Sequence, residues 1–215
     1  MLTIWGRRSA FNVQKVLWLA DELELDYRHI DAGGTAGGLD SQDFLAKNPH
    51  GRIPLIDDDG AVVWESHAIL RYLAARFGGA VMWPDDPAER SRSDRWMDWA
   101  QTSLQPDFLT GVFWGFYRTP EAARDMDKVT SSIESCARHA ILLDGALQDR
   151  RFIAGDDLTP ADIAVGNHLY RYFGIEIDRP GVPHLVAYYE RLCERPAYRK
   201  NVMLPFQDLY GRLEY

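Results

Sequence analysis

The chain contains few of the residues that mark several large classes of protein. Its 215 residues include two cysteines, Cys136 and Cys193, and neither belongs to a CxxC motif or a Cys/His cluster. This excludes a disulfide framework and a dithiol centre, and no metal cofactor is implied. No run of about 18 apolar residues occurs, so no membrane-spanning segment is expected. The first residues form a strand pattern rather than a leader, which favours a cytoplasmic location.

Acidic residues outnumber basic ones, 32 to 24. The formal net charge is −8, which argues against nucleic acid or an anionic membrane as the main partner. Hydrophobic residues make up 46% of the chain and charged residues 26%, as is typical of a globular protein. At this length the chain can form one large domain or two modest domains, each with its own core.

The N-terminal part of the sequence alternates between strand and helix patterns. Residues 2–5 and 26–31 have strand patterns, and between them apolar residues recur at helical spacing. Two strands joined by such a helix form a βαβ unit with parallel strands. After a short helix at 42–46, the runs 53–57 and 61–64 flank Asp58-Asp59-Gly60, which predicts a β-hairpin. A helix ending near Phe77 completes the order of a thioredoxin-like domain.

The C-terminal part shows no strand pattern after the linker near residues 78–87. Helical patterns cover 88–104, 121–149, 163–173 and 182–193. The third follows Thr159-Pro160-Ala161-Asp162, a variant of the capping box with proline at the first helical position. This helix is apolar on nearly all sides and is expected to be buried. We therefore expect a thioredoxin-like α/β domain at 1–78 and an all-helical bundle domain at 88–215.

Glu65 and Ser66 precede the helix that ends near Phe77. Ser66 stands at the expected N-cap, where its hydroxyl and the first free amides of the helix would form an anion-binding nest. Glu65 adds a carboxylate at the same place. An acceptor beside donors suits a ligand with an ammonium and a carboxylate on one carbon, as in an amino acid. An ordinary helix cap is the alternative.

Pro54 stands at the start of a predicted strand, where its missing amide is unusual. If the Ile53-Pro54 bond is cis, the turn exposes the amide and the carbonyl of Ile53. That arrangement would capture a short extended ligand in the manner of an added β-strand.

These residues carry a resemblance to a known family. The pattern N-P-x-G-x-I-P-x-(I/L)-x-D-D-G, followed by W-E-S-x-A-I-x-R-Y-L, resembles the glutathione-binding half of the cytosolic glutathione transferases. Similarity extends over the whole chain, and Trp96-Met97-Asp98-Trp99, Arg118-Thr119-Pro120 and Glu194-Arg195-Pro196 resemble a bacterial branch of that family. The resemblance implies the two-domain fold of the family, glutathione as co-substrate and a homodimer.

Glutathione chemistry requires the thiol as a thiolate, whereas a free cysteine thiol has a pKa of about 8.5. A hydrogen-bond donor at a helix N-terminus lowers that pKa by about one or two units. The resemblance to serine-type members implies Ser9 as this donor, with Asn12, one helical turn later, as the alternative. Ser9 would otherwise cap the first helix. Arg7 is a candidate cation near the thiolate or the electrophile, or else a solvated loop arginine.

Three further residues would hold the remainder of glutathione. His50 and Arg52 resemble positions that bind the glycyl carboxylate in the family, and exposure to solvent is the alternative for each. Ile53 would act through its backbone.

The second domain would supply the pocket for the electrophile. Phe113, Trp114 and Tyr117 come from an aromatic stretch in which only some side chains can face a pocket, and packing in the core is the alternative. Arg118 would receive an anionic substrate or pair with Asp107 or Glu121.

The resemblance predicts an enzyme that conjugates the glutathione thiolate to small hydrophobic electrophiles. A glutathione-binding protein without transferase activity would keep Pro54, Glu65 and Ser66 and would not need Ser9. A glutathione-dependent reductase or peroxidase is the other alternative. A reductase normally uses a cysteine at the first helix, and none is present there.

Overall fold

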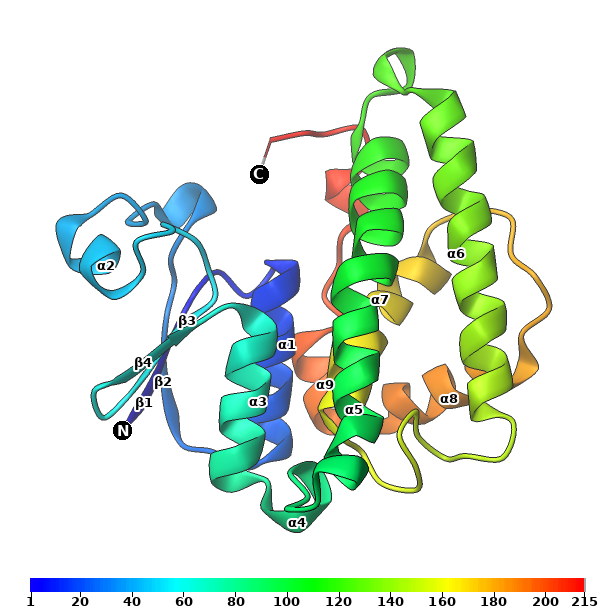
Figure 1. The fold of residues 1–215 in the computed structure, drawn as a ribbon. Helices are drawn as coiled ribbons and strands as arrows, with labels where there is room; N and C mark the ends of the chain where they lie inside the picture. The colour runs from blue at the N-terminus through cyan, green and yellow to red at the C-terminus, as the bar shows by residue number, and fades with distance from the viewer. Residues whose placement is uncertain (215) are drawn as a thin grey trace. The chain divides into compact units, whose positions relative to one another are not determined.

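A computed structural model describes residues 1–214, and Tyr215 lies outside the described residues. The chain forms two compact units (Figure 1). The first unit consists of Met1–Asp85 together with Pro196–Leu204. The second consists of Asp86–Arg195 together with 205–214. The predicted domain limits of 1–78 and 88–215 stay a prediction.

The first unit is built on a four-stranded sheet with the strand order β2-β1-β3-β4. The parallel pairing of β1 and β2 confirms the predicted βαβ unit. β3 is antiparallel to both β1 and β4, and the positive φ angles of Asp59 (50°) and Gly60 (96°) confirm the hairpin turn. The strand bounds are Leu2–Trp5 (β1), Tyr27–Ile30 (β2), Leu55–Asp58 (β3) and Ala61–Trp64 (β4).

Two helices, α1 (Phe11–Glu22) and α3 (Ser66–Phe77), lie side by side on one face of this sheet (Figure 1). Ile4 and Ile56 pair across β1 and β3, and neither side chain is exposed. The apolar residues of both helices pack at helical spacing, as predicted from the sequence. The core of the first unit therefore lies between the sheet and these two helices.

The short helix α2 (Gln42–Lys47) ends beside residues of the neighbouring strands. The Lys47 Nζ atom lies 2.6 Å from a carboxylate oxygen of Asp57 and 5.9 Å from the centre of the Trp5 ring. Because Trp5 and Ile4 are neighbours in β1, their side chains point to opposite faces of the sheet. α2 thus contacts the face that α1 and α3 leave open. Two further short elements are Gly34–Ala36 (η1) and Gly79–Met82 (α4).

Helix α9 (Pro196–Asn201) comes from the end of the chain and packs against α1 within the first unit. The rings of Trp18 and Tyr198 meet edge to face with their centroids 4.7 Å apart. Asn201 and Lys200 both reach the Asp21 carboxylate, at 2.6 and 2.8 Å. The first unit is therefore assembled from two stretches of chain that are far apart in the sequence.

The second unit is helical. Its α-helices are α5 (Pro87–Trp99), α6 (Met126–Leu147), α7 (Pro160–Gly174) and α8 (Pro183–Glu194). α5 continues through the π-helical segments η2 (Ala100–Leu104) and η3 (Pro106–Arg118). Two 3₁₀ turns cover Glu121–Ala123 (η4) and Gln207–Leu209 (η5). No helix among residues 1–214 is both long and apolar enough to cross a membrane.

The predicted helix at 121–149 begins later than expected. Glu121–Ala123 forms a 3₁₀ turn, and α6 begins at Met126 because Asp125 caps it by accepting from the Lys128 amide. The aromatic stretch before it is π-helical, with the Thr119 amide bonded to the Trp114 carbonyl. Pro106 has no amide proton and so interrupts the usual ladder of a continuous helix.

The predicted capping box at the start of α7 is confirmed, with Pro160 at its first position. Asp162 is fully buried and accepts hydrogen bonds from the Ile153 amide, the Thr159 amide and hydroxyl, and the Tyr188 hydroxyl, at 2.8–3.0 Å. Most of α7 is buried, as predicted. The carboxylate joins the beginning of α7 to the preceding loop and to α8.

Candidate functional site

The predicted site residues of the first unit lie at one end of its sheet. β1 ends at Trp5 and β4 ends at Trp64, while β3, which runs the opposite way, begins at Leu55. Leu55 is paired with Trp5 on one side and with Trp64 on the other. The segments that follow β1, precede β3 and follow β4 therefore meet at the same end. Those segments contain Arg7, Ser9, His50, Arg52, Ile53, Pro54, Glu65 and Ser66.

Gly6 allows the segment before β3 to approach the start of α1. Its φ angle is 143°, and a Cβ atom at this position would lie 2.4 Å from a methyl carbon of Val13 and 3.2 Å from Cβ of Ile53. No residue with a side chain fits between these neighbours. The close approach sets Ile53 beside the first turn of α1.

Ile53 and Pro54 are joined by a cis peptide bond. β3 begins only at Leu55, two residues later than the predicted strand, so Ile53 and Pro54 belong to the loop. Pro54 is buried and Ile53 is half-buried. Ile53 therefore lies in an irregular segment at the end of the sheet.

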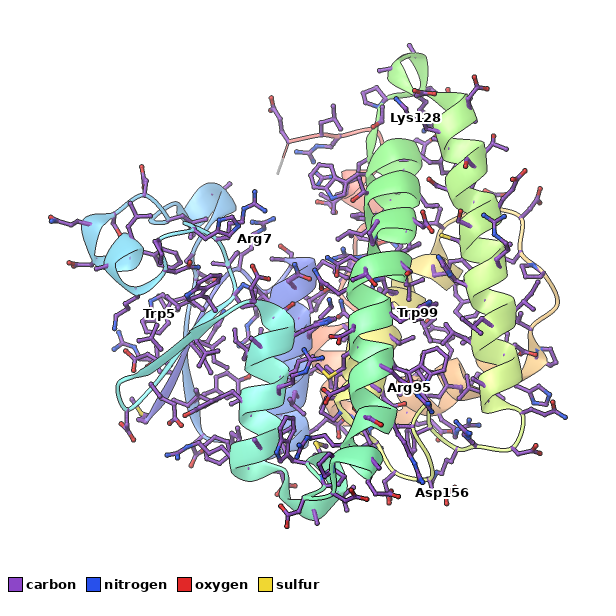
Figure 2. All side chains as sticks on the ribbon, in the orientation of Figure 1. Trp5, Arg7, Arg95, Trp99, Lys128 and Asp156 are labelled. Carbon is purple, nitrogen blue, oxygen red and sulfur yellow. The ribbon has the colours of Figure 1, made fainter. Side chains whose placement is uncertain are left out.

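Arg7 follows β1 at this end of the sheet, where Figure 2 labels it. Its amide donates to the Ala32 carbonyl at 3.0 Å. A Cβ atom at Gly34 would lie 3.2 Å from Cδ of Arg7, and one at Gly33 would lie 3.6 Å from its Nη1. Arg7 thus packs against Gly33 and Gly34 and is half-buried, which differs from the solvated loop arginine that was the alternative.

Ser9 is exposed and lies just before α1. The N-cap of α1 is Ala10, and no side chain caps this helix, so Ser9 does not have the simple capping role that was its alternative. Asn12 is half-buried, and its Oδ1 atom has no hydrogen-bond partner among the residues that the structure describes. Rotation of the amide exchanges its oxygen and nitrogen, so Asn12 can present either a donor or an acceptor. The start of α1 therefore carries the polar side chains of Ser9 and Asn12, and the Asn12 side-chain amide is placed to contact a ligand.

Glu65 and Ser66 form the beginning of α3. The prediction that Ser66 is the N-cap was wrong, because Glu65 occupies that position and Ser66 is the first helical residue. The backbone of Glu65 has a φ angle of 71°, a value that residues other than glycine rarely adopt. The Glu65 side chain is exposed. Ser66 is buried, and no side chain caps the helix. The first turn of α3 thus lacks a side-chain cap, and a carboxylate lies beside it, as suits a site that binds an anion next to an ammonium.

The loop that carries His50 and Arg52 is held by Asn48, a residue that the sequence analysis missed. Asn48 is buried, accepts from the His50 amide at 3.0 Å and donates to the Arg52 carbonyl at 2.7 Å. The side chains of His50 and Arg52 are both exposed. The His50 ring lies 6.4 Å from the ring of Trp64, next to Glu65. An asparagine before proline signals a turn, and this signal could have identified Asn48.

Two buried polar residues behind the site were also missed. Lys15 of α1 is fully buried, and its Nζ atom lies 3.1 Å from Nε2 of His67, the second residue of α3. Burial lowers the Lys15 pKa to about 7, and the negative charge of Glu65 opposes this shift. The position of a lysine among the apolar residues of α1 was the sequence signal that could have identified Lys15 as a buried polar residue.

The predicted electrophile pocket belongs to an aromatic cluster of the second unit. Phe113 is buried and stacks on Tyr117, with centroids 5.8 Å apart and an interplanar angle of 11°. Phe206 and Tyr210 each meet the Tyr117 ring with centroids 5.3 Å apart. The guanidinium of Arg171 lies 4.6 Å from the centre of the Phe113 ring. Phe113 thus packs in the core, while Trp114 and Tyr117 are half-buried.

Arg118 lies in the interior of the second unit. It is fully buried and donates to the carbonyls of Arg212 and Glu214 at 2.8 and 2.7 Å. Its guanidinium lies 4.0 Å from the centre of the Trp114 ring. Arg118 therefore anchors the end of the chain, because charged donors satisfy carbonyls that the tail leaves open.

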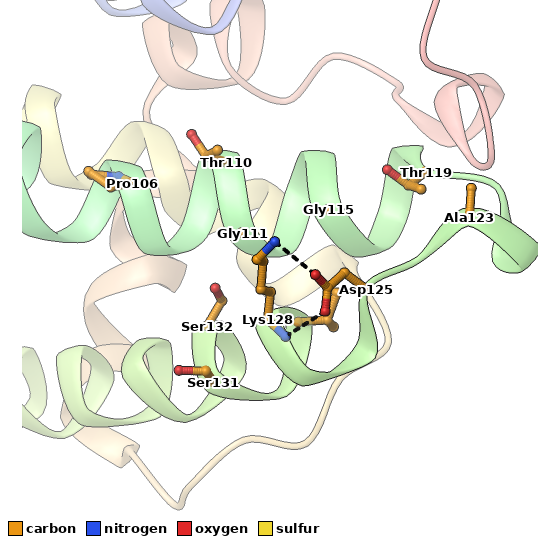
Figure 3. A pocket seen from close by; sticks show the side chains of 11 residues that line it. Pro106, Thr110, Gly111, Gly115, Thr119, Ala123, Asp125, Lys128, Ser131 and Ser132 are labelled. Atoms are coloured by element: carbon orange, nitrogen blue, oxygen red, sulfur yellow. Dashed lines mark hydrogen bonds and ion pairs between the residues drawn. The ribbon is translucent and has the colours of Figure 1, made fainter.

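A separate cavity of about 460 Å³ lies between η3 and α6 in the second unit (Figure 3). Lys128 and Asp125 form an ion pair at its edge, 2.8 Å apart. The predicted pocket residues Phe113, Trp114 and Tyr117 are not among those that line it. Among residues 1–214, no group of His, Cys, Asp and Glu side chains is placed to hold a metal ion.

Comparisons with known proteins bear on both units. A family model described as "Glutathione S-transferase, N-terminal domain" matches residues 1–75, and one described as "Glutathione S-transferase, C-terminal domain" matches residues 106–196. Glutathione S-transferase GstB of Escherichia coli (strain K12) is 41% identical over 207 residues, covering 95% of this chain and 99% of the relative. Glutathione S-transferase 3 of Zea mays is 30% identical over 210 residues, covering 94% and 93%.

A solved structure is similar over nearly the whole chain. It is the crystal structure of the theta class glutathione S-transferase from the citrus canker pathogen Xanthomonas axonopodis pv. citri with glutathione bound. The TM-score is 0.88 at 41% sequence identity, and the match covers 95% of this chain and 98% of that one.

Proposed function

The chain belongs to the glutathione S-transferase family, and on that premise we propose that it is an enzyme that conjugates the glutathione thiolate to small hydrophobic electrophiles. The observation that carries this proposal is the open beginning of α3. Its first amides have no side-chain cap, the Glu65 carboxylate lies beside them, and Ser66 is buried. This combination suits the ammonium and the carboxylate of the γ-glutamyl group.

The remaining groups of the first unit suit the rest of the tripeptide. The backbone of Ile53 would hold the cysteinyl part, and His50 and Arg52 would bind the glycyl carboxylate. Both of these side chains are exposed on a loop that the buried Asn48 holds in place. The sulfur would then lie near the uncapped start of α1.

The thiolate would be stabilised by Ser9, with Asn12 as the alternative donor. Both lie at the N-terminus of α1, where the free amides and the helix dipole favour a negative charge. The packed position of Arg7 would add a positive charge to the same end of the sheet. The anion thus stabilised is the nucleophile of the reaction.

The chemical step is the formation of a sulfur–carbon bond. An electron pair of the thiolate attacks the electrophilic carbon. In a substitution, the leaving group departs with the pair of the bond that breaks; in an addition, the displaced pair takes a proton from water. We propose that Trp114 and Tyr117, which are half-buried, line the pocket, and that the buried Phe113 supports Tyr117 from behind by stacking on its ring. Arg118 supports that pocket by anchoring the tail.

We further propose a homodimer in the cytoplasm. β4 is an edge strand, and its Val62 and Trp64 side chains are 36% and 41% exposed. Exposed apolar residues on an edge strand favour burial against a partner surface. Sedimentation of the purified protein tests this, and a monomer at micromolar concentration would contradict the homodimer.

The test of the function is a comparison of the variants Ser9→Ala and Asn12→Ala with wild type. We expect wild type to lower the pKa of bound glutathione by about one or two units, measured by the ultraviolet absorbance of the thiolate. One of the two variants should lose this shift together with turnover of an electrophile. Arg8→Ala, at an exposed neighbouring position, is the control and should behave like wild type. Unchanged turnover in both variants would remove the proposed mechanism, and glutathione binding without any turnover would favour a binding protein.

A further inference from the structure

The buried pair Lys15 and His67 lies directly behind the two helix starts of the site. Lys15 belongs to α1 and His67 to α3, and their Nζ and Nε2 atoms are 3.1 Å apart. The Lys15 side chain is not exposed, and that of His67 is 7% exposed. The pair therefore joins the two helices by a directional contact in the interior of the first unit.

Each member of the pair is next to a proposed glutathione contact. His67 immediately follows Ser66 at the start of α3. Lys15 comes three residues after Asn12 and four after Phe11, so the three share one side of α1. Because helical side chains lean toward the N-terminus, Lys15 points toward the turn that carries Asn12. Its Nζ atom lies 5.2 Å from the centre of the Phe11 ring, within that turn.

We propose that Lys15 and His67 are a pair of positioning residues, which fix the start of α3 relative to the start of α1 so that the γ-glutamyl and thiol contacts are both at the correct spacing for glutathione. This inference rests on the proposed function. Glutathione is one ligand held at two helix starts, so a displacement of one start relative to the other weakens binding even when every contact residue is intact.

A lysine is a costly residue for this position, which supports a specific role. Burial lowers its pKa to about 7 against the opposing negative charge of Glu65, so the surroundings disfavour the charged amine. An apolar side chain of similar length would fill the same space without this cost. An apolar contact has no fixed direction, however, whereas a hydrogen bond between the two helices does.

The test measures ligand affinity in Lys15→Met, His67→Leu and the double variant. We expect each single variant to raise the Kd for glutathione about tenfold, and the double variant to raise it no further than a single one. At saturating glutathione, kcat should stay within about twofold of wild type, since the reacting groups are unchanged. His67→Gln keeps an acceptor for the lysine and should restore most of the affinity. Lys128→Met, at an exposed lysine, is the matched control.

A second ligand separates positioning from general damage to the fold. Cysteinylglycine lacks the γ-glutamyl group, so its Kd should be nearly the same in wild type and in both single variants. The preference for glutathione over cysteinylglycine should therefore fall about tenfold. An unchanged Kd for glutathione, an equal loss for both ligands, or additive effects in the double variant would each overturn the inference. If wild type itself does not bind glutathione, the proposed function fails, which is a different result.

Discussion

The helices α7 and α3 begin in opposite ways. At the start of α7, Asp162 and Thr159 satisfy the free backbone groups from within the protein, and the carboxylate is fully buried. At the start of α3, the N-cap residue Glu65 has a φ angle of 71°, its side chain is exposed, and no side chain caps the helix. A helix start whose amides are capped by side chains of the protein, here called a closed start, contributes to stability. A helix start without a side-chain cap, here called an open start, can donate its amide hydrogens to a ligand.

The other helices extend the comparison. Ser41, Asp86 and Asp125 cap α2, α5 and α6 by accepting from backbone amides. α1, whose start is proposed to hold the thiolate, has Ala10 at its N-cap and no side-chain cap. Within the first unit, the long helices α1 and α3 are thus the ones with open starts, and both starts lie at the site.

The largest effect is expected from Asp162→Ala at the closed start. The change leaves the buried Tyr188 hydroxyl and two backbone amides without their acceptor, so the free energy of unfolding should fall by about 3–5 kcal/mol. Denaturant unfolding measures this loss. At a temperature where the variant is folded, its Kd for glutathione should equal that of wild type. A stable variant with weakened binding would remove the distinction between the two helix starts.

Removal of the polar side chains at the start of α3 should weaken glutathione binding and leave the stability of the unliganded protein nearly unchanged. In wild type, glutathione at 100 times its Kd should stabilise the fold by about 2.7 kcal/mol. The double variant Glu65→Ala, Ser66→Ala should lose this stabilisation, while its unliganded stability stays within about 1 kcal/mol of wild type. Thermal unfolding with and without glutathione measures both quantities. Ser131→Ala, at an exposed position of α6, is the control.

The buried amine of Lys15 should make the free energy of unfolding depend on pH. Because the folded-state pKa of Lys15 is lowered to about 7 from 10.5, the unfolded chain binds the extra proton between these values, and stability rises with pH across that window. The full cost of burying the charge is present below about pH 7. Lys15→Met should therefore be more stable than wild type by about 2 kcal/mol at pH 6, with a smaller advantage at pH 9. Urea unfolding at the two pH values tests this, and an advantage independent of pH would contradict it.

Glu65→Gly should separate stability from binding at a single residue. Glycine adopts a φ angle of 71° without strain, so the unliganded protein should gain about 1 kcal/mol. Glutathione binding should weaken, because the carboxylate is lost. Thermal unfolding and calorimetric titration measure the two changes, and a variant that is both less stable and weaker in binding would argue against strain at Glu65.

The smallest effect is expected when an open start is closed. Ala10 has extended backbone angles that suit an N-cap, and Ala10→Ser should stabilise α1 by about 0.5–1 kcal/mol. The new hydroxyl would compete with the thiolate for the first amides, so turnover should fall even though the protein is more stable. Equal turnover in this variant and in wild type would show that these amides do not contribute.

Local signals made much of the fold predictable. The βαβ unit, the hairpin around Asp59 and Gly60 and the capping box of α7 all depend on residues close together in the sequence, and all three are confirmed. The choice between Glu65 and Ser66 as N-cap was missed because it depends on one backbone angle, which a strand pattern followed by a helix pattern does not specify.

Other features depend on contacts between distant residues. The burial of Lys15 depends on His67, 52 positions away, and the anchoring role of Arg118 depends on carbonyls near the end of the chain. The π-helical form of the aromatic stretch was not predicted, although Phe113 and Tyr117, four residues apart, still stack on one another. The predicted roles of Ser9, Asn12, His50 and Arg52 stay predictions.

The return of α9 to the first unit has a consequence for the order in which the protein is made. Tyr198 and Asn201 complete the packing of Trp18 and Asp21 on α1, and in the sequence they come after α8, the last long helix of the second unit. Synthesis proceeds at about 5–20 residues per second and domains usually fold as they emerge, N-terminal first. Here the first unit lacks α9 until the helices α5, α6, α7 and α8 of the second unit have been synthesised. The unit whose synthesis begins first is thus expected to be completed only after the long helices of the second unit, and a nascent chain stopped before residue 196 should expose the side of α1 that α9 covers.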